Sequence, residues 1–317
     1  MNTRPSYLAL HERGELRRRV ETARELLRDC TLCPWRCRVN RLAGGQGRCR
    51  VGSLPVVASC GPHFGEERPL VGSHGSGTIF LTGCNLKCIF CQNYGISQQG
   101  EGEEVAVATL AGMMVALWQQ GCHNLNFVTP THQVAQILAA LPLAIGAGVD
   151  VPLVYNCGGY EEVATLQLLD GVFDIYMPDF KYGDSVVAQQ LSGAPHYVET
   201  AQAALGEMHR QVGDLLLDER GLAVRGLLVR HLVLPGGLAG TRRVMQFIAR
   251  ELSADTYVNL MDQYHPCYQA TEHPFLQRRI SRAEFTEAVA MAQEEGIRRL
   301  DGITRPTRPS PLPKSPG

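Results

Sequence analysis

The sequence predicts an α/β protein built as an open, partial (βα)6 barrel, with a cysteine-rich module at its N-terminus. From residue 78 onward, six short β-prone runs alternate with stretches of helical character, which favours parallel strands joined by helices. These runs are apolar, as expected of strands that are buried on both faces. Six units fit an open barrel better than a closed one of eight, although a doubly wound sheet fits the same alternation.

The elements can be placed in chain order. The expected strands are Thr78–Thr82, Asn124–Thr129, Pro152–Asn156, Phe173–Pro178, Leu227–Leu234 and Tyr257–Met261. The expected helices lie near 105–120, 133–147, 161–169, 184–218, 241–251 and 281–295. Before them, residues 8–29 place Leu16, Val20 and Leu26 on one side, which predicts an amphipathic helix. We therefore divide the chain into a helix plus cysteine-rich module (1–60), the barrel (61–304) and a disordered, Pro- and Ser-rich tail (305–317).

The composition narrows the classes of function. The 317 residues include 30 Lys and Arg against 31 Asp and Glu, so no overall basic field favours nucleic acid or an anionic membrane. The N-terminus lacks the apolar segment of a secretory signal. The most apolar long stretch, 134–154, is broken by Pro142, Asp150 and Pro152, unlike a membrane span. We expect a cytoplasmic protein outside the membrane, with nucleic acid disfavoured as a partner.

Three of the eleven cysteines directly follow the first expected strand. Cys84, Cys88 and Cys91 have the spacing C-x3-C-x2-C. In a reducing compartment, clustered thiols indicate a metal or catalytic site rather than disulfides. Three thiolates can bind three irons of a [4Fe–4S] cluster and leave the fourth iron open to a small molecule. The alternatives are three small buried side chains, or a zinc site completed by a distant histidine.

A second group of cysteines lies near the N-terminus, with the spacing C-x2-C-x3-C-x11-C. Its members are Cys30, Cys33, Cys37 and Cys49. Four thiols with glycines between them predict a tetrahedral metal site, and zinc and a second [4Fe–4S] cluster fit equally well. Five arginines surround this group: Arg36, Arg38, Arg41, Arg48 and Arg50. They could offset thiolate charge or bind an acidic partner, or they could be a solvated, charged turn.

Polar residues stand at the ends of the other expected strands. Because the carboxyl ends of parallel strands meet at one edge of the sheet, we expect these residues to converge on one cavity. Asp179 and Lys181 are two positions apart, so in a strand they point to the same face. There they could bind the carboxylate and hydroxyls of a cofactor, or form an internal salt bridge. Gly158 could permit close approach of a ligand to the backbone, or form a turn.

The motif CNLKCIFC resembles the cluster motif of radical S-adenosylmethionine enzymes, with Phe90 in the aromatic position of that family. DIYMPDFKY and VRHLVLPGG resemble segments of pyruvate formate-lyase activating enzymes. The set GSGTIF, CQNYGISQ, VTPTH, YNCGGYE and MPDFKYGD is similar to an uncharacterised branch related to those activators. The resemblance covers about residues 75–300, and it implies a partial barrel of the radical S-adenosylmethionine type.

This resemblance implies a cofactor set and partners. It implies a [4Fe–4S] cluster on the three thiols, S-adenosyl-L-methionine on the open iron, and reductive cleavage to a 5′-deoxyadenosyl radical. The electron donor would be a low-potential protein such as flavodoxin or ferredoxin, and the substrate a partner glycyl radical enzyme; the alternative is radical modification of a small molecule or tRNA. Thr129 and His132 stand where the family usually has Gly-Gly-Glu, and could replace its contacts. The candidate cofactor-binding residues are therefore Phe90, Thr129, His132, Asn156, Gly158, Asp179 and Lys181.

Overall fold

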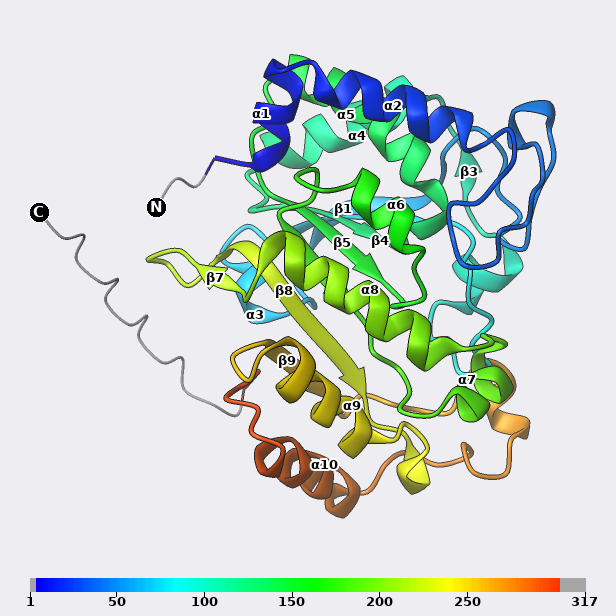
Figure 1. The fold of residues 1–317 in the computed structure, drawn as a ribbon, viewed down its shortest axis with the longest axis vertical. Helices are drawn as coiled ribbons and strands as arrows, with labels where there is room; N and C mark the ends of the chain where they lie inside the picture. Colours follow the sequence, from blue (N-terminus) through cyan, green and yellow to red (C-terminus); the bar gives the residue numbers. More distant parts are fainter. Residues whose placement is uncertain (1–3, 303–317) are drawn as a thin grey trace, which may run out of the picture.

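The fold is organised by one ten-stranded sheet. The computed structural model describes residues 4–302, and the expected tail at 305–317 lies outside the described residues. The strand order is β10-β9-β8-β6-β5-β4-β2-β1-β3, with β7 paired to β8 beside this path (Figure 1). Because β10 and β3 remain as two edges, the described sheet is an open barrel, as predicted.

Six parallel strands form the centre of this sheet, and each corresponds to one of the six predicted runs. They are β2 (Ser76–Leu81), β4 (Leu125–Val128), β5 (Leu153–Cys157), β6 (Ile175–Pro178), β8 (Ala223–Leu232) and β9 (Tyr257–Met261). Their order in the sheet is their order in the chain. A doubly wound sheet reverses its order part-way, whereas right-handed crossovers in constant order place their helices on one face. The structure therefore decides for the partial barrel.

Four short or edge strands were not predicted. They are β1 (Val56–His63), β3 (Glu103–Glu104), β7 (Leu216–Leu217) and β10 (Arg299–Leu300). Strand β1 is antiparallel to β2 and carries β3 on its other side. Because β1 crosses residue 60, it joins the N-terminal module continuously to the barrel sheet.

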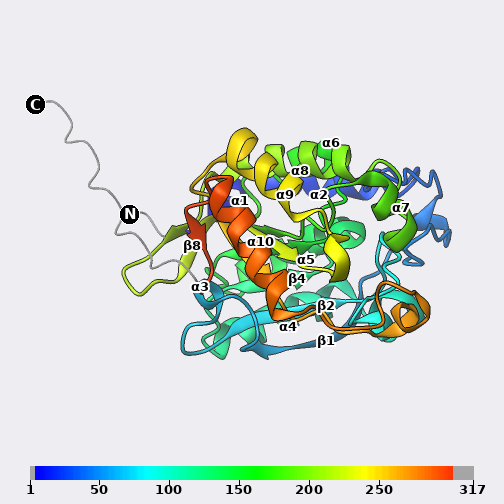
Figure 2. The same cartoon turned by 90° about the horizontal axis from the view of Figure 1, so that it is seen from below.

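Ten α-helices lie within residues 4–302. They are α1 (Ser6–Glu12), α2 (Glu15–Glu25), α3 (Arg68–Val71), α4 (Val107–Gln119), α5 (Val134–Gly146), α6 (Val163–Leu168), α7 (Ser185–Ser192), α8 (Tyr197–Val212), α9 (Thr241–Phe247) and α10 (Arg282–Glu294). The described 3-10 turns are Arg41–Ala43, Thr131–Gln133, Pro235–Gly237 and Tyr268–Glu272, and the π turns are Gly95–Gln99 and Ile248–Leu252. Helices α6, α8 and α9 lie along one side of the molecule, and β1 and β2 along the other (Figure 2).

Two predicted helices were wrong, because each is two helices. The segment 8–29 is broken at Gly14, whose φ of 71° is left-handed, a conformation that glycine adopts without steric cost. The segment 184–218 is broken between α7 and α8, where Gly193 has a φ of 61° and Pro195 follows. Proline disfavours helical backbone in the residue before it, so the two helices meet at a turn.

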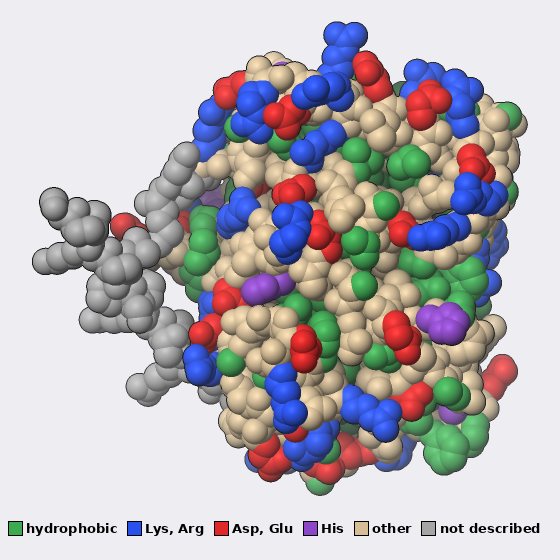
Figure 3. Space-filling view, in the orientation of Figure 1, with side chains coloured by type: hydrophobic (Ala, Val, Ile, Leu, Met, Phe, Trp, Pro, Cys, Tyr) green, Lys and Arg blue, Asp and Glu red, His purple; other side chains and the backbone are tan. Residues whose placement is uncertain are grey.

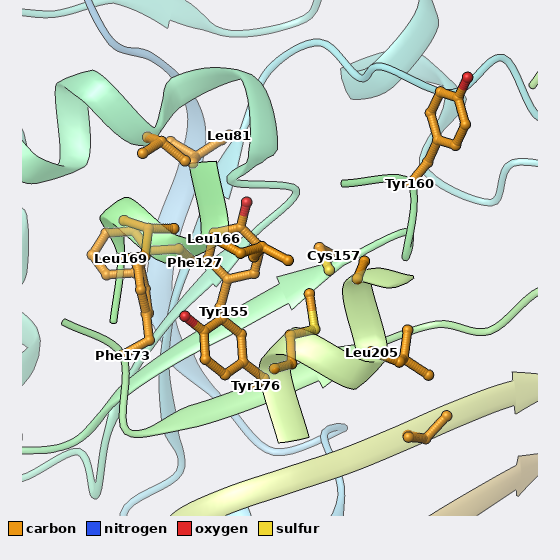
Figure 4. Close-up of a cluster of buried hydrophobic side chains, with 14 of the residues drawn as sticks. Leu81, Phe127, Tyr155, Cys157, Tyr160, Leu166, Leu169, Phe173, Tyr176 and Leu205 are labelled. Carbon is orange, nitrogen blue, oxygen red and sulfur yellow. The ribbon is translucent and has the colours of Figure 1, made fainter. Parts of the chain in front are cut away.

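The two faces of the parallel sheet bury different side chains. Tyr155 of β5 packs edge-on against Phe173, with ring centroids 4.9 Å apart, and Phe127 of β4 joins them (Figure 4). The alternate residues belong to a second buried cluster that includes Val154, Ile175, Met177 and Leu228. Because side chains of a strand alternate between faces, this second row lies on the opposite face of the sheet, and at the carboxyl ends of the strands it continues into polar residues.

The N-terminal helices pack on the barrel. Helix α2 contacts α5, and the hydroxyl of Tyr7 on α1 donates to the carbonyl of Val151, 3.0 Å away. On the face shown in Figure 3, Lys and Arg side chains are interspersed with Asp and Glu, in agreement with a formal net charge of −1. Across residues 4–302, no helix combines the length and apolar character that crossing a membrane requires.

Candidate functional site

The thiols of Cys84, Cys88 and Cys91 lie in the loop that follows β2, and each sulfur has a hydrogen-bond partner. The amide of Leu86 donates to the sulfur of Cys84 at 3.3 Å, and the hydroxyl of Ser192 donates to that of Cys88 at 2.9 Å. The sulfur of Cys91 lies 3.1 Å from the hydroxyl of Ser97. Hydrogen bonds to sulfur favour the thiolate and tune iron–sulfur clusters, so the surroundings of this triad fit thiolate ligands.

The three thiols also influence one another. Burial raises the pKa of Cys84 to about 12, and the neighbouring thiols of Cys88 and Cys91 add to the increase. Within residues 4–302, no three His, Cys, Asp or Glu side chains already form a geometry that would hold a single metal ion. Each sulfur of a cluster binds a different iron, so the triad's soft, mutually close donors suit a cluster, and the sulfurs would adjust as it binds.

The loop of the triad is fixed at several points. The backbone amides of Lys87 and Ile89 donate to the carbonyls of Ser192 and Leu191 at the end of α7, both at 2.9 Å. The ring of Phe90 is buried and meets Tyr182 and Tyr264 edge-on. The aromatic residue that the motif singled out therefore anchors the loop in an aromatic cluster.

A charged network lies at the carboxyl ends of β5, β6 and β8, and it contains three of the predicted residues. A carboxylate oxygen of Asp179 lies 2.5 Å from the ammonium nitrogen of Lys181. Its other oxygen lies 2.8 Å from Nε of Arg230, whose NH2 group donates to the side chain of Asn156 at 2.7 Å. Asp179 and Lys181 stand just beyond the last residue of β6, Pro178. The structure thus brings Asn156, Asp179 and Lys181 together through Arg230.

Asp179 is ionised in this network. Burial alone would raise its pKa, but the charges of Arg230 and Lys181 outweigh that effect and lower the pKa below its ordinary value. Two further acids come from the segment before α3: Glu66 and Glu67 lie 3.7 Å and 3.9 Å from the guanidinium of Arg230. Sequence reasoning missed both, because they belong to no recognisable strand end. Arg230 lies within the predicted strand Leu227–Leu234, but nothing in the local sequence indicates its central position in the network.

The triad and the charged network are adjacent. The charge of Lys181 lowers the pKa of Cys88, against the larger effect of burial. Gly158, after β5, separates the two regions: a Cβ there would lie 2.7 Å from a methyl carbon of Leu86 and 3.6 Å from Cε of Lys181. The absence of a side chain at Gly158 therefore allows the triad loop to approach the network closely.

Thr129 and His132 lie beside the site, not among the charges. Thr129 has a left-handed φ of 61°, and its amide donates to the carbonyl of Asn156 at 2.8 Å. His132 is buried, and its Nε2 lies 2.7 Å from the carbonyl of Thr82, just before the triad. Burial lowers the pKa of His132 to about 4, so the imidazole is neutral. Both residues contact the backbone that carries the site.

The second group of cysteines lines a small cavity next to the triad loop. Cys30, Cys33, Cys37 and Cys49 all line it, together with Arg41, Asn85 and His132. The indole nitrogen of Trp35 donates to the carbonyl of Asn85 at 2.7 Å. Because Asn85 follows Cys84 directly, the N-terminal module touches the triad loop through its backbone.

Comparison with solved structures gives only distant similarity. No family model matches the chain. Among solved structures, similar chains are the radical S-adenosylmethionine methyltransferase TsrM from Kitasatospora setae with cobalamin and a [4Fe–4S] cluster (TM-score 0.42, 15% identity, 59% of this chain and 36% of that one) and anSMEcpe with bound AdoMet (TM-score 0.46, 8% identity, 67% and 57%). The chain therefore spans less than two thirds of the length of either, and at these scores the likeness supports no functional conclusion.

A relative found by its sequence is more similar to this chain than these solved structures are. The uncharacterized protein MJ0674 of Methanocaldococcus jannaschii is 33% identical over 288 residues, which cover 88% of this chain and 78% of the relative. This identity extends through nearly all of the barrel and into the N-terminal module. The chain therefore belongs to the same family as MJ0674.

Proposed function

We propose that the protein is a radical S-adenosylmethionine enzyme. The observation that carries the proposal is the position of the Cys84, Cys88 and Cys91 thiols beside the largely buried Asp179–Arg230–Lys181 network, at the carboxyl ends of the parallel strands. In parallel α/β barrels this end carries the reacting groups. Three soft ligands would leave one iron of a [4Fe–4S] cluster without a protein ligand, and the polar groups of the network lie next to the triad.

The residues of this chain have separable roles in the proposal. The three thiols would hold the cluster, which when bound and reduced would supply the electron for reductive cleavage of S-adenosyl-L-methionine. Lys181 and Arg230 present cationic donors for the carboxylate of that cofactor, and Asn156 presents an amide for its hydroxyls. Asp179 positions both cations through its two oxygens. The aromatic cluster around Phe90 fixes the loop and excludes water from that side.

The partners are the finer part of the proposal. A flavodoxin or ferredoxin would supply the electron, and a partner glycyl radical enzyme would be the substrate, as the resemblance of DIYMPDFKY and VRHLVLPGG to activating enzymes implies. Radical modification of a small molecule or tRNA is the alternative. The free state of all eleven cysteines agrees with a reducing compartment such as the cytoplasm.

The test is formation of 5′-deoxyadenosine by the anaerobic, iron-reconstituted, reduced protein. We expect the wild-type chain to release it, and a chain with Cys84, Cys88 and Cys91 replaced by Ser to release none. Cys60→Ser is the matched control, because Cys60 is exposed and outside both cysteine groups. Continued product formation by the triple variant, or none from an iron-loaded wild type, would refute the proposal.

A further inference from the structure

The second cysteine group contains a charge that the described residues do not balance. The side chain of Arg41 is 1% exposed. Its guanidinium donates to the carbonyl of Gly52 at 2.7 and 3.0 Å and to that of His132 at 2.8 Å. No carboxylate of residues 4–302 forms an ion pair with it. A buried charge without a counter-charge is costly, so this position calls for an anion.

The nearest candidates for that anion are the thiols. The NH1 nitrogen of Arg41 lies 3.9 Å from the sulfur of Cys30, and Cys30, Cys33, Cys37 and Cys49 line one cavity with Arg41. The backbone at Gly47 lies close to one of these sulfurs, because a Cβ added there would lie 2.9 Å from the sulfur of Cys37. Glycine at this position therefore leaves the space that the Cys37 sulfur occupies.

We propose that Cys30, Cys33, Cys37 and Cys49 bind a metal centre as four thiolates, and that the buried guanidinium of Arg41 offsets part of its charge. A divalent ion with four thiolates carries two negative charges, as does an oxidised [4Fe–4S] cluster with the same ligands, and the buried Arg41 supplies one positive charge to offset them. The shared chemistry is a tetrathiolate centre. Since the thiols do not yet form a closed ion site, the loop 30–49 would tighten as the metal binds. This inference does not depend on the proposed enzymatic activity.

The first test counts metal in the full chain with Cys84, Cys88 and Cys91 replaced by Ser, which leaves the four-thiol group intact. After anaerobic loading with zinc or with iron and sulfide, we expect either one zinc or about four irons per chain, and the two arms identify the metal. Adding Cys37→Ser and Cys49→Ser should remove it, whereas Cys60→Ser should not. A folded chain that binds neither metal would overturn the proposal.

A second measurement covers the case in which the triad-free chain does not fold. In the wild-type background, Cys49→Ser should reduce the metal content by the amount assigned to the four-thiol centre, and Cys60→Ser by none. Equal metal content in both variants would overturn the proposal.

The role of Arg41 has its own test, a chelator competition for the bound metal. Arg41→Met removes the charge but keeps much of the volume, and we expect about ten- to a hundredfold weaker retention, the effect of losing one charge-assisted contact. Arg41→Lys, which keeps the charge, should retain most of the affinity. Equal retention in Arg41→Met and the wild type would refute the counter-charge role.

Discussion

The two cysteine groups differ in the number of ligands and in what surrounds them. The triad of Cys84, Cys88 and Cys91 adjoins Lys181 and the polar ends of three parallel strands. The N-terminal group has four thiols in irregular loops, where Arg36, Arg38 and Arg50 adopt left-handed φ angles of 40°, 57° and 60°. One group is built into the barrel, and the other organises a segment with almost no regular secondary structure.

This difference indicates a division of labour. Structural metal sites are typically closed by four protein ligands, whereas catalytic sites keep one position open. The triad has three thiols beside a charged network, and the N-terminal group has four thiols around a small cavity. We therefore expect chemistry at the triad and support from the N-terminal group.

One segment joins the two groups, residues 160–162 after β5. The carbonyl of Tyr160 accepts from the side chain of Asn85 in the triad loop at 2.6 Å. Glu162 binds Arg36, between Cys33 and Cys37, through two hydrogen bonds of 2.8 and 2.9 Å. Between them, Glu161 is buried and accepts from Thr131 and Tyr155. A change in this segment should therefore affect both groups.

The largest expected effect comes from a change in the charged network beside the triad. Asp179→Asn leaves Lys181 and Arg230 without their shared carboxylate, which for a buried pair costs about 3–5 kcal/mol of unfolding free energy. We also expect S-adenosyl-L-methionine to bind about ten- to a hundredfold more weakly, since both cations lose their position. Isothermal titration and a urea melt measure the two effects.

Asp255→Asn is the control for that change, because Asp255 forms an exposed pair with Arg298 and such pairs contribute little. If Asp179→Asn lowers the unfolding free energy but leaves the cofactor affinity unchanged, the network has a structural role only, and it does not distinguish the triad from the N-terminal group.

The second effect concerns the segment that joins the groups. Burial raises the pKa of Glu161 to about 7, above its usual range near 4.3. Between these values the folded chain keeps a proton that the unfolded chain has lost, so stability falls as pH rises through the window and levels off above it. Glu161→Gln removes this dependence. Relative to the wild type, the variant should gain on the order of 3 kcal/mol between pH 4 and pH 8.

Urea unfolding of both proteins at several pH values measures that gain. Glu219→Gln is the control, because Glu219 is an exposed carboxylate outside the segment 160–162. A difference between Glu161→Gln and wild type that stays constant with pH would show that Glu161 does not titrate in this window.

A smaller effect should follow from crowding the contact between the triad loop and the network. Gly158→Ala places a Cβ 2.7 Å from Leu86, and overpacking of this kind costs about 1–3 kcal/mol. Iron binding at the triad should weaken while the four-thiol centre keeps its metal. Gly112→Ala, which meets no atom within 4 Å, is the control. Equal loss from both centres would contradict their independence.

The smallest effect tests the direct link. Trp35→Phe removes the hydrogen bond to the carbonyl of Asn85, worth about 0.5–1.5 kcal/mol. Trp35→Phe combined with Cys49→Ser forms a double-mutant cycle, read as the thermal stability of each variant after the same anaerobic metal loading. We expect the two changes to be coupled, since both act on the same module. Additive losses would show that the Trp35 contact does not depend on the metal centre.

Much of the barrel could be predicted because its signals are local. Each parallel strand is a short apolar run, such as Leu153–Cys157, and burial on both faces requires that composition. The shared face of Asp179 and Lys181 follows from their spacing of two, and the ion pair between them agrees with it. The cysteine spacing likewise identified both groups before any contact was known. The predicted helix boundaries were wrong at Gly14 and Gly193, because backbone conformation rather than hydrophobic pattern ends the helix there.

The sequence by itself determined the six parallel strands, their order of appearance and the residue types at their ends. Only the tertiary structure decided that Arg230 joins Asn156 to Asp179 while its neighbour His231 is buried against Phe180 and Thr241. It also decided that Trp35 meets Asn85, fifty positions away. The physical reason is that alternation along a strand fixes which face a side chain takes, whereas its partner comes from a distant segment that only packing brings near.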